Sequence, residues 1–500
     1  MSINASIKTG KAMDDTSGRL TNIVSSSSRQ RRENILKKKR AAAQTTDSTS
    51  MGQTTIDMNE INRHKSILLN DSAAPEAYID SVMFFRKLLS TDHYPPIDLV
   101  INTGLVPRFA LFLKYDNCPN LQYESAWVLT NIASGSKEQT AAVIDSGALP
   151  DLIRLVDSPN DGVREQATWA LGNIAGDSVQ YRNAITDAGC VDRLLFHLNN
   201  PNCTLLFQKN AVWLLSNLCR MRDGVAPDFE RVKNCLPYMK ECLQCDQEDI
   251  VIDACWCFAF ITDSNKANTK YVLGMGVLPM VIAMLGSSSI KVVNPALRVV
   301  GNVLAGDDQQ TQMCIENGVL KYLEQLVNSS QYTVVKEALW CLSNITAGSE
   351  SQIQLVLNDE IMPWLVSIIQ DGRTDLQRES CWVICNAICG GNPAQIAQVT
   401  QTEGVIPAIC KLMNANSEPK LQTIILDSLD RCLTLGEFIM HQSGAEVNLV
   451  KEQLYQCGFV DTLEQMTFPN EALYQKADEF VVKHFGYEEE EENLNFPQMN

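Results

Sequence analysis

The sequence predicts an all-α solenoid built from repeats of a little over 40 residues. The first observation is a tryptophan followed four residues later by an asparagine, as at Trp127 and Asn131. Further copies occur at Trp169/Asn173, Trp213/Asn217, Trp256/Phe260, Arg298/Asn302, Trp340/Asn344 and Trp382/Asn386, of which the third and fourth are altered. Successive copies lie 42 to 44 residues apart. A period of this length without a strand signal is typical of armadillo or HEAT repeats.

Two glycine patterns recur with the same period. Gly104, Gly147, Gly276 and Gly404 are each followed three residues later by proline, and Gly189 and Gly318 continue this series without proline. Glycine commonly ends a helix, and proline is tolerated in the first turn of the next one. A second glycine follows five of the six asparagines by three or four residues, at Gly135, Gly176, Gly306, Gly348 and Gly390. We interpret these as helix C-caps, and we count about ten repeats.

The paired tryptophan and asparagine predict a binding surface. Residues four apart lie on one face of a helix, and so does the residue three before each tryptophan. That residue is polar in all six copies that contain tryptophan: Glu124, Gln166, Asn210, Asp253, Glu337 and Glu379. Carboxamides bind an extended backbone regardless of its sequence, and indole faces attract lysine and arginine. One such pair would more simply be core packing, but five intact pairs in register favour a groove for an extended basic peptide.

Charge divides the chain into a basic arm and an acidic body. The net charge is −18, yet residues 1–50 hold ten Lys and Arg against four Asp and Glu. We predict a largely disordered arm over 1–55, a repeat domain over 56–485 and an acidic disordered tail over 486–500. The acidic body argues against direct binding of nucleic acid. The cluster at 29–40 could form a helix on an acidic partner, or be a solvated run or a nuclear-localisation or nucleic-acid patch.

Several other functions lack support in the sequence. No apolar run reaches the roughly 18 residues of a membrane span, and the start is too polar for a secretory signal. The 17 cysteines then indicate a reducing compartment, where most would be small core residues. Cys242 and Cys245 have metal-like spacing but no second ligand pair, so we expect no metal and no cofactor. No phosphate loop or nucleophile–base context indicates an enzyme.

These motifs resemble the importin-α (karyopherin-α) family of nuclear-import adaptors, from about residue 75 to 485. The resemblance implies a right-handed superhelical armadillo solenoid with two sites for mono- and bipartite nuclear localisation signals. The implied major site comprises Trp127, Asn131, Gly135, Thr140, Trp169, Asn173, Asp177, Asn210, Trp213, Asn217, Asp253 and Trp256. The implied minor site comprises Arg298, Asn302, Asp308, Thr311, Glu337, Trp340, Ser343, Asn344, Glu379, Trp382 and Asn386. Asp177 would pair with the most discriminating lysine of the signal.

The basic arm resembles the importin-β-binding segment of the same family. The residues that carry this likeness are Arg19, Arg29, Arg31, Arg32, Lys37, Lys38, Lys39 and Arg40. The arm is shorter than the family's and lacks its second basic cluster. The resemblance implies importin-β, cargo signals and an export receptor with Ran-GTP as partners, and shuttling between cytoplasm and nucleus. The alternative is another armadillo scaffold, such as a catenin-like hub, but such grooves are typically basic, whereas this body is acidic.

Overall fold

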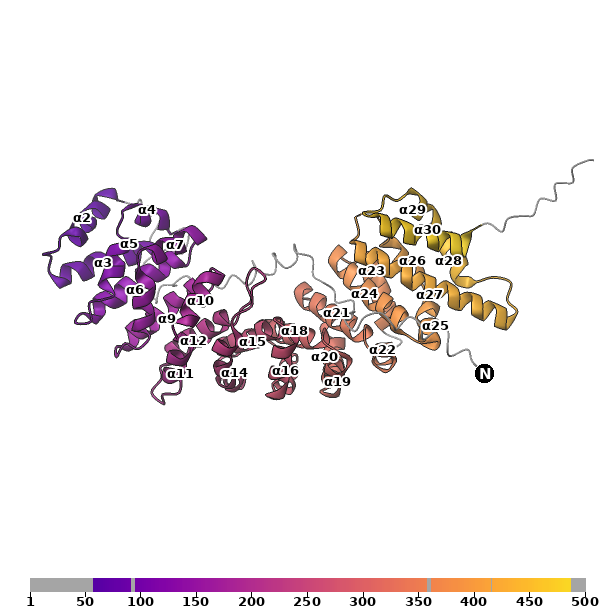
Figure 1. Ribbon diagram of the computed structural model, residues 1–500, viewed down its shortest axis with the longest axis horizontal. Coiled ribbons are helices and arrows are strands. Elements are labelled where there is room, and N and C mark those ends of the chain that lie inside the picture. Colours follow the sequence, from indigo (N-terminus) through magenta and orange to yellow (C-terminus); the bar gives the residue numbers. More distant parts are fainter. Residues whose placement is uncertain (1–56, 91–94, 358–360, 415, 487–500) are drawn as a thin grey trace, which may run out of the picture. The chain divides into compact units, whose positions relative to one another are not determined.

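The computed structural model describes residues 57–90, 95–357, 361–414 and 416–486. Over these ranges the chain is helical, and the one extended pairing is an isolated bridge between Arg222 and Val225. The all-α prediction and the armadillo solenoid are thereby confirmed (Figure 1). Residues 487–500 of the predicted acidic tail and the residues predicted to bind importin-β (Arg19, Arg29, Arg31, Arg32, Lys37, Lys38, Lys39 and Arg40) lie outside the described residues.

Contacts between residues divide the described chain into two compact units, with the boundary between Val299 and Val300 inside α18 (Ile290–Leu304). The helices of the first unit are α2 (Met58–Leu69), α3 (Pro75–Leu89), α4 (Ile97–Asn102), α5 (Val106–Phe112), α6 (Pro119–Ala133), α7 (Lys137–Asp145), α8 (Ala148–Leu155), α9 (Asp161–Ala175), α10 (Val179–Asp187), α11 (Cys190–Leu198), α12 (Leu205–Leu218), α13 (Phe229–Val232), η2 (Lys233–Cys235), α14 (Leu236–Cys242), α15 (Glu248–Thr262), α16 (Lys266–Gly274) and α17 (Leu278–Met284). Those of the second are α19 (Asp308–Glu316), α20 (Val319–Leu326), α21 (Tyr332–Thr346), α22 (Glu350–Val356), α23 (Ile361–Asp371), α24 (Thr374–Gly390), α25 (Pro393–Gln401), α26 (Val405–Lys411), α27 (Pro419–Ser443), α28 (Leu449–Gln456), α29 (Phe459–Gln465) and α30 (Glu471–Phe485).

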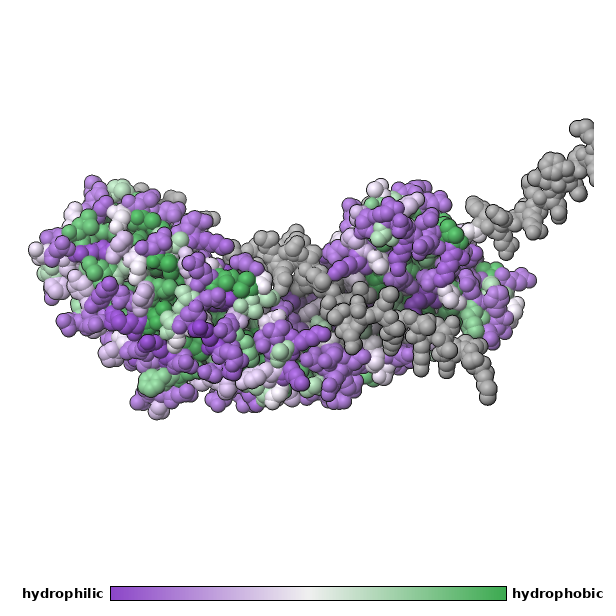
Figure 2. Space-filling model, viewed as in Figure 1, coloured by the Kyte–Doolittle hydropathy of each residue, from purple (hydrophilic) through white to green (hydrophobic). Residues whose placement is uncertain are grey.

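The long helix of each repeat forms the spine of its unit. In the first unit α3, α6, α9, α12 and α15 pack against one another in that order, and in the second α21, α24, α27 and α30 do so (Figure 1). Their apolar residues, such as Ala126, Val128 and Leu129, are fully buried. Burying a leucine or valine side chain stabilises a fold by about 1.5–3 kcal/mol, so this spine is the core that each repeat shares with its neighbours. The face in Figure 2 is mainly hydrophilic, with separate apolar patches.

The turn predicted from glycine and proline is confirmed. Gly104, Gly147, Gly189, Gly276, Gly318 and Gly404 have φ between 69° and 80°, the left-handed region that glycine adopts without strain. The prolines that follow lie in the first turn of their helices, as Pro107 does in α5.

The C-cap interpretation of the second glycine series holds for Gly176, which is the C-cap of α9, but not for three other members. Gly135, Gly306 and Gly348 are not among the glycines with positive φ. A β-carbon on each would instead lie 1.8, 1.6 and 2.1 Å from the Oε1 atom of Gln139, Gln310 and Gln352. These positions need glycine because a glutamine side chain passes over them.

Each of those glutamines lies in a short helix, α7, α19 or α22, that the sequence patterns did not predict as a separate element. In each case a capping box opens it: Ser136 with Gln139, Asp307 with Gln310, Ser349 with Gln352 and Asn392 with Gln395. The box satisfies two backbone N–H groups at the start of the helix. The spacing of a Ser, Asp or Asn three residues before Gln is visible in the sequence and could have revealed these helices. Each full repeat therefore has three helices, as in α7, α8 and α9.

Within the described ranges no single helix is both long and apolar enough to cross a membrane. Lys266–Gly274 and Leu278–Met284 meet the criteria of length and composition only as a pair, and they are bent by 90°.

Candidate peptide-binding site

The long helices carry most of the residues predicted for the two sites. In the first unit these are Trp127 and Asn131 on α6, Trp169 and Asn173 on α9, Asn210, Trp213 and Asn217 on α12, and Asp253 and Trp256 on α15. The minor-site residues are Arg298 and Asn302 on α18, Asp308 and Thr311 on α19, Glu337, Trp340, Ser343 and Asn344 on α21, and Glu379, Trp382 and Asn386 on α24. We call each Trp/Asn pair, with the polar residue three before the tryptophan, a rung. Because α6, α9, α12 and α15 pack against one another in that order, the rungs of the predicted major site lie side by side.

The asparagines form a ladder of hydrogen bonds between neighbouring repeats. Asn173 Nδ2 donates to the backbone carbonyl of Thr130 at 3.1 Å, and Asn217 Nδ2 donates to that of Gly172 at 3.0 Å. In the second unit Asn386 Nδ2 donates to the Ser343 carbonyl at 2.9 Å. Each acceptor immediately precedes the asparagine of the repeat before, so the recurring offset fixes the register of adjacent long helices.

Two asparagines depart from this pattern. Asn131 Nδ2 donates to Ser90 Oγ at 3.2 Å, at the start of the series. Asn344 is 2% exposed, and its Nδ2 is buried without a hydrogen-bond partner. A buried unpaired N–H costs about 1–3 kcal/mol, so this amide is a donor that an added acceptor would satisfy.

The tryptophans pack closely against the preceding repeat. A β-carbon on Gly172 would lie 2.1 Å from Cζ3 of Trp213, and one on Gly301 would lie 2.0 Å from Cζ3 of Trp340. The indoles of Trp213 and Trp340 therefore pack directly against a glycine of the previous long helix.

The exposure of the indoles differs along the series. Trp127, Trp213, Trp340 and Trp382 are buried, with Trp213 at 0%, whereas Trp169 and Trp256 are half-buried. Trp256 stacks on Phe260 with ring centroids 5.6 Å apart, and the Arg86 guanidinium lies 4.3 Å from the Trp127 ring centroid. The accessibility that binding requires is therefore seen for Trp169 and Trp256, and the binding role of all six indoles stays a prediction.

Three of the polar residues that lie three positions before a tryptophan also join helices. Glu124 forms an ion pair with Arg86 at 2.5 Å, Gln166 Nε2 donates to Thr130 Oγ1 at 2.7 Å, and Asn210 Nδ2 donates to the Glu165 carbonyl at 3.3 Å. Burial raises the pKa of the Glu124 carboxyl, and Arg86 opposes that shift. These side chains hold the fold together, a role that sequence reasoning missed because their partners lie in other repeats.

Thr140 and Thr311 likewise have internal partners. The Thr140 hydroxyl donates to the carbonyls of Ala133 and Ser136, at 3.2 and 3.0 Å, and Thr311 Oγ1 donates to Leu304 at 3.3 Å. Each hydroxyl binds the last turn of a long helix, whose carbonyls have no partner within that helix.

A loop beside the predicted major site brings positive charge that the sequence did not predict. Arg222 Nη1 donates to the backbone carbonyl of Asp177, and Arg220 lies 5.6 Å from the Phe260 ring centroid. The loop is held by Arg182, which is fully buried and donates to the carbonyls of Arg220 and Val225 at 2.7 and 3.0 Å. Burial lowers the pKa of Arg182, and the charge of Arg222 acts in the same direction.

Comparison with known proteins decides the family. Residues 93–134, 136–176 and 307–347 match the armadillo/β-catenin-like repeat. The importin subunit alpha-4 of Arabidopsis thaliana is 37% identical over 422 residues, which is 84% of this chain and 78% of that protein. The chain belongs to the importin-α family. It is thus a member of a family of nuclear-import adaptors, as the resemblance of its sequence motifs implied.

Other importin-α proteins match this family member over shorter stretches. Importin subunit alpha-B of Dictyostelium discoideum is 46% identical over 238 residues, 47% of this chain and 46% of that protein. Importin subunit alpha-1b of Oryza sativa subsp. japonica is 36% identical over 253 residues, 51% of this chain and 46% of that protein. In these matches the chain spans about half the length of the curated relative.

A solved engineered protein has the same fold as this importin-α chain. The TM-score is 0.71 at 21% sequence identity, over 85% of this chain and 99% of the engineered one. At this identity the likeness concerns the fold alone.

Proposed function

We propose that this chain is an import adaptor that binds basic nuclear localisation signals in its Trp/Asn ladder and connects their cargo to importin-β. The observation that carries the proposal is the ladder itself. The amide of Asn217 makes one hydrogen bond to Gly172, and a carboxamide has two N–H donors and a carbonyl acceptor. Amides held in register along neighbouring helices are therefore suited to pair with successive peptide units of an extended strand.

Acidic side chains give the ladder its preference for cations. Asp177 and Asp253 lie in the major-site rungs and are 5% and 2% exposed, and Glu337 and Glu379 are half-buried in the minor-site rungs. A carboxylate with little access to water pairs with an ammonium group more strongly than an exposed one does. We therefore infer that lysine side chains of the signal are read at these positions.

The two predicted sites lie largely in different units, so they could bind different parts of one signal. The major-site rungs from Trp127 to Trp256 fall in the first unit, and the minor-site rungs from Asn302 to Asn386 fall in the second. We propose that a single basic cluster binds the first and that a bipartite signal also engages the second. The same proposal includes export with an export receptor and Ran-GTP, and hence shuttling between cytoplasm and nucleus. It assigns no catalytic role, in keeping with an adaptor family.

The decisive experiment is fluorescence anisotropy with a labelled lysine-rich signal peptide. Asp177→Lys places like charges together, and we expect at least about 30-fold weaker binding, or about 2 kcal/mol. Asp192→Lys makes the same charge change at an exposed position of α11 and is the matched control. Equal loss in both variants, or none in either, would contradict the assignment of Asp177. Thermal unfolding of each variant separates loss of binding from loss of fold.

A second titration separates the adaptor from a catenin-like scaffold. The adaptor binds the lysine-rich peptide and not an acidic peptide of equal length, because the body is acidic. The opposite preference would favour the scaffold. The connection to importin-β is tested by co-elution with the full chain and with a variant in which Lys37, Lys38, Lys39 and Arg40 are alanine, which we expect not to co-elute.

A further inference from the structure

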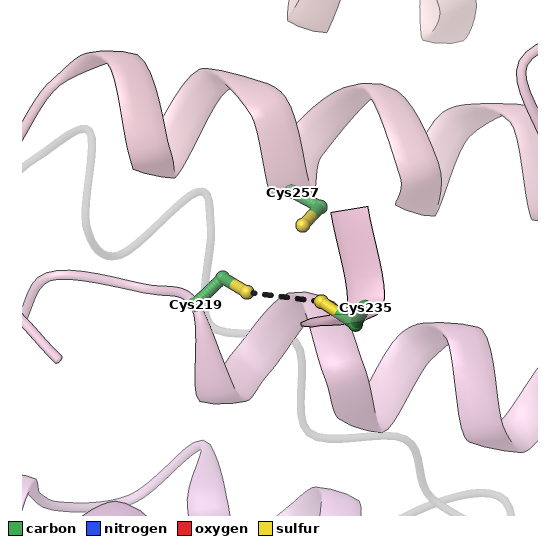
Figure 3. A group of neighbouring side chains, drawn as sticks. All are labelled: Cys219, Cys235 and Cys257. Carbon is green, nitrogen blue, oxygen red and sulfur yellow. Dashed lines mark hydrogen bonds between the residues drawn. The ribbon is translucent and has the colours of Figure 1, made fainter. Parts of the chain in front are cut away.

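Three cysteines from separate elements face one another in the core of the first unit. Cys219 is the C-cap of α12, Cys235 ends η2 and Cys257 lies in α15 (Figure 3). All three are fully buried. Their sulfur atoms lie within 4.8 Å of one another, and the Sγ atoms of Cys219 and Cys235 are 3.8 Å apart.

This arrangement has the dimensions of a three-coordinate metal site. With metal–sulfur bonds of about 2.3 Å, a planar trigonal ion holds its sulfurs about 4 Å apart. The observed separations reach that geometry with shifts of less than an ångström. In Figure 3 the Cys257 sulfur points toward the gap between the other two, so an ion placed there would touch all three.

The identity of the ligands selects the kind of ion. Thiolates favour soft cations such as Cu(I), whereas structural zinc is almost always four-coordinate. Among the described residues this cluster contains no fourth Cys, His, Asp or Glu ligand. Because all three cysteines are fully buried, water is also a poor candidate for a fourth ligand.

Charge around the cluster supports a thiolate site. Binding requires the three thiols to release three protons to solvent, so one Cu(I) leaves a net charge of −2 on the ion and its three ligands. The fully buried Arg182 guanidinium interacts electrostatically with Cys219 and would offset part of that negative charge.

We propose that Cys219, Cys235 and Cys257 bind one Cu(I) ion in a trigonal thiolate site. The site joins the end of α12, the segment before α14 and the middle of α15. An ion there would cross-link three elements of the repeat that carries the Arg220–Ala226 loop. The proposal is independent of the signal-binding function.

Another pair, Cys242 and Cys245, has the sequence spacing of metal ligands. Cys242 is buried and Cys245 half-buried, and neither belongs to the cluster. Cys381 and Cys385 are also close, at 3.7 Å between sulfurs, but they sit one turn apart on a single helix. The three-cysteine cluster draws its ligands from positions 16 and 22 residues apart, and no short motif reveals it.

The test is anaerobic titration of the reduced full chain with Cu(I) held by a competing chelator. The chelator is chosen to bind Cu(I) strongly enough that cysteines outside the cluster do not take the ion from it. We expect one tightly bound equivalent, and at least about 100-fold weaker uptake in Cys235→Ala and in Cys257→Ala. Cys190→Ala removes a fully buried cysteine outside the cluster and is the matched control, expected to bind as the parent does. X-ray absorption of the loaded protein should show three sulfur neighbours.

Several outcomes would overturn the proposal. These are equal uptake by the parent and both cluster variants, tighter binding of Zn²⁺ than of Cu(I), or a Cys219–Cys235 disulfide in protein isolated without air. Cys235→Ala and Cys257→Ala are independent replacements, and binding of the signal peptide by each variant reports whether the fold is intact. If one variant fails to fold, the other decides the question.

Discussion

The indole of Trp213 rests directly on the α-carbon of Gly172, one repeat earlier in the chain. A methyl group at position 172 would come within 2.1 Å of Cζ3, much closer than non-bonded carbons approach. Gly172 also supplies the carbonyl that accepts the hydrogen bond of Asn217. One glycine therefore positions both members of the next rung.

Gly172→Ala should displace Trp213 and weaken the rung. We expect a loss of about 1–3 kcal/mol in the free energy of unfolding, because an added methyl group in a packed core forces side chains or backbone to shift. Signal-peptide affinity should fall by about tenfold. Chemical denaturation and peptide anisotropy measure the two effects. Gly274→Ala is the control, since a β-carbon there has no neighbour within 4 Å, and it should be neutral or slightly stabilising.

Asn344→Leu and Asn386→Leu should have opposite effects on stability. Asn344 Nδ2 is buried without a partner, so leucine removes an unsatisfied donor and should leave the free protein equally stable or more stable. Asn386 donates to the Ser343 carbonyl, and its loss should cost about 1–3 kcal/mol. Both replacements should weaken the binding of a bipartite signal. Similar stability changes in the two variants would show that the ladder bonds are not what distinguishes them.

Gly306→Ala and Gln310→Ala should not be additive. A β-carbon on residue 306 would lie 1.6 Å from Gln310 Oε1, the atom that accepts the Asp307 N–H in the capping box. Either change disrupts the box, and each should cost about 0.5–2 kcal/mol. The double variant should be little worse than the more damaging single one, because the same interaction is lost once. Additive losses in thermal or chemical unfolding would contradict this account.

Replacing Glu124 should change how stability depends on pH. Burial raises the pKa of this carboxyl in the folded chain, and Arg86 offsets part of the shift. A group with a raised folded pKa contributes stability below its unfolded pKa and loses that contribution as pH rises through the folded value. The stability of the parent relative to Glu124→Gln should therefore decrease from about pH 4 upward. Denaturation of both proteins between pH 4 and 8 measures it, and an increasing difference would reverse the assigned sign.

The features that the sequence predicted are local or periodic. The recurrence of the Trp127/Asn131 pair predicted the length of the repeat. Gly147 followed by Pro150 predicted a turn, and in the structure Gly147 has the positive φ of the left-handed region. Such signals depend on residues within four positions of each other. Binding by the predicted site residues themselves stays a prediction.

What the sequence did not reveal depends on contacts between repeats. The contact of Trp213 with Gly172 joins residues 41 apart in the sequence, and the ion pair of Glu124 with Arg86 joins residues 38 apart. Gly306 resembled a C-cap because glycine at a helix end usually adopts positive φ, whereas here it makes room for a side chain. The anchoring of the Arg222 loop by Arg182 has no local pattern at all.

The bond from each asparagine to the carbonyl one repeat earlier spans 43 or 45 residues. The connecting segments thus differ in length while the paired atoms stay opposite each other. Insertions and deletions between the long helices are consequently free to accumulate during evolution, whereas a single residue gained or lost inside a long helix would turn every later side chain of that helix by about 100°. Variation among related chains should accordingly concentrate in the loops and spare the spacing within the spine.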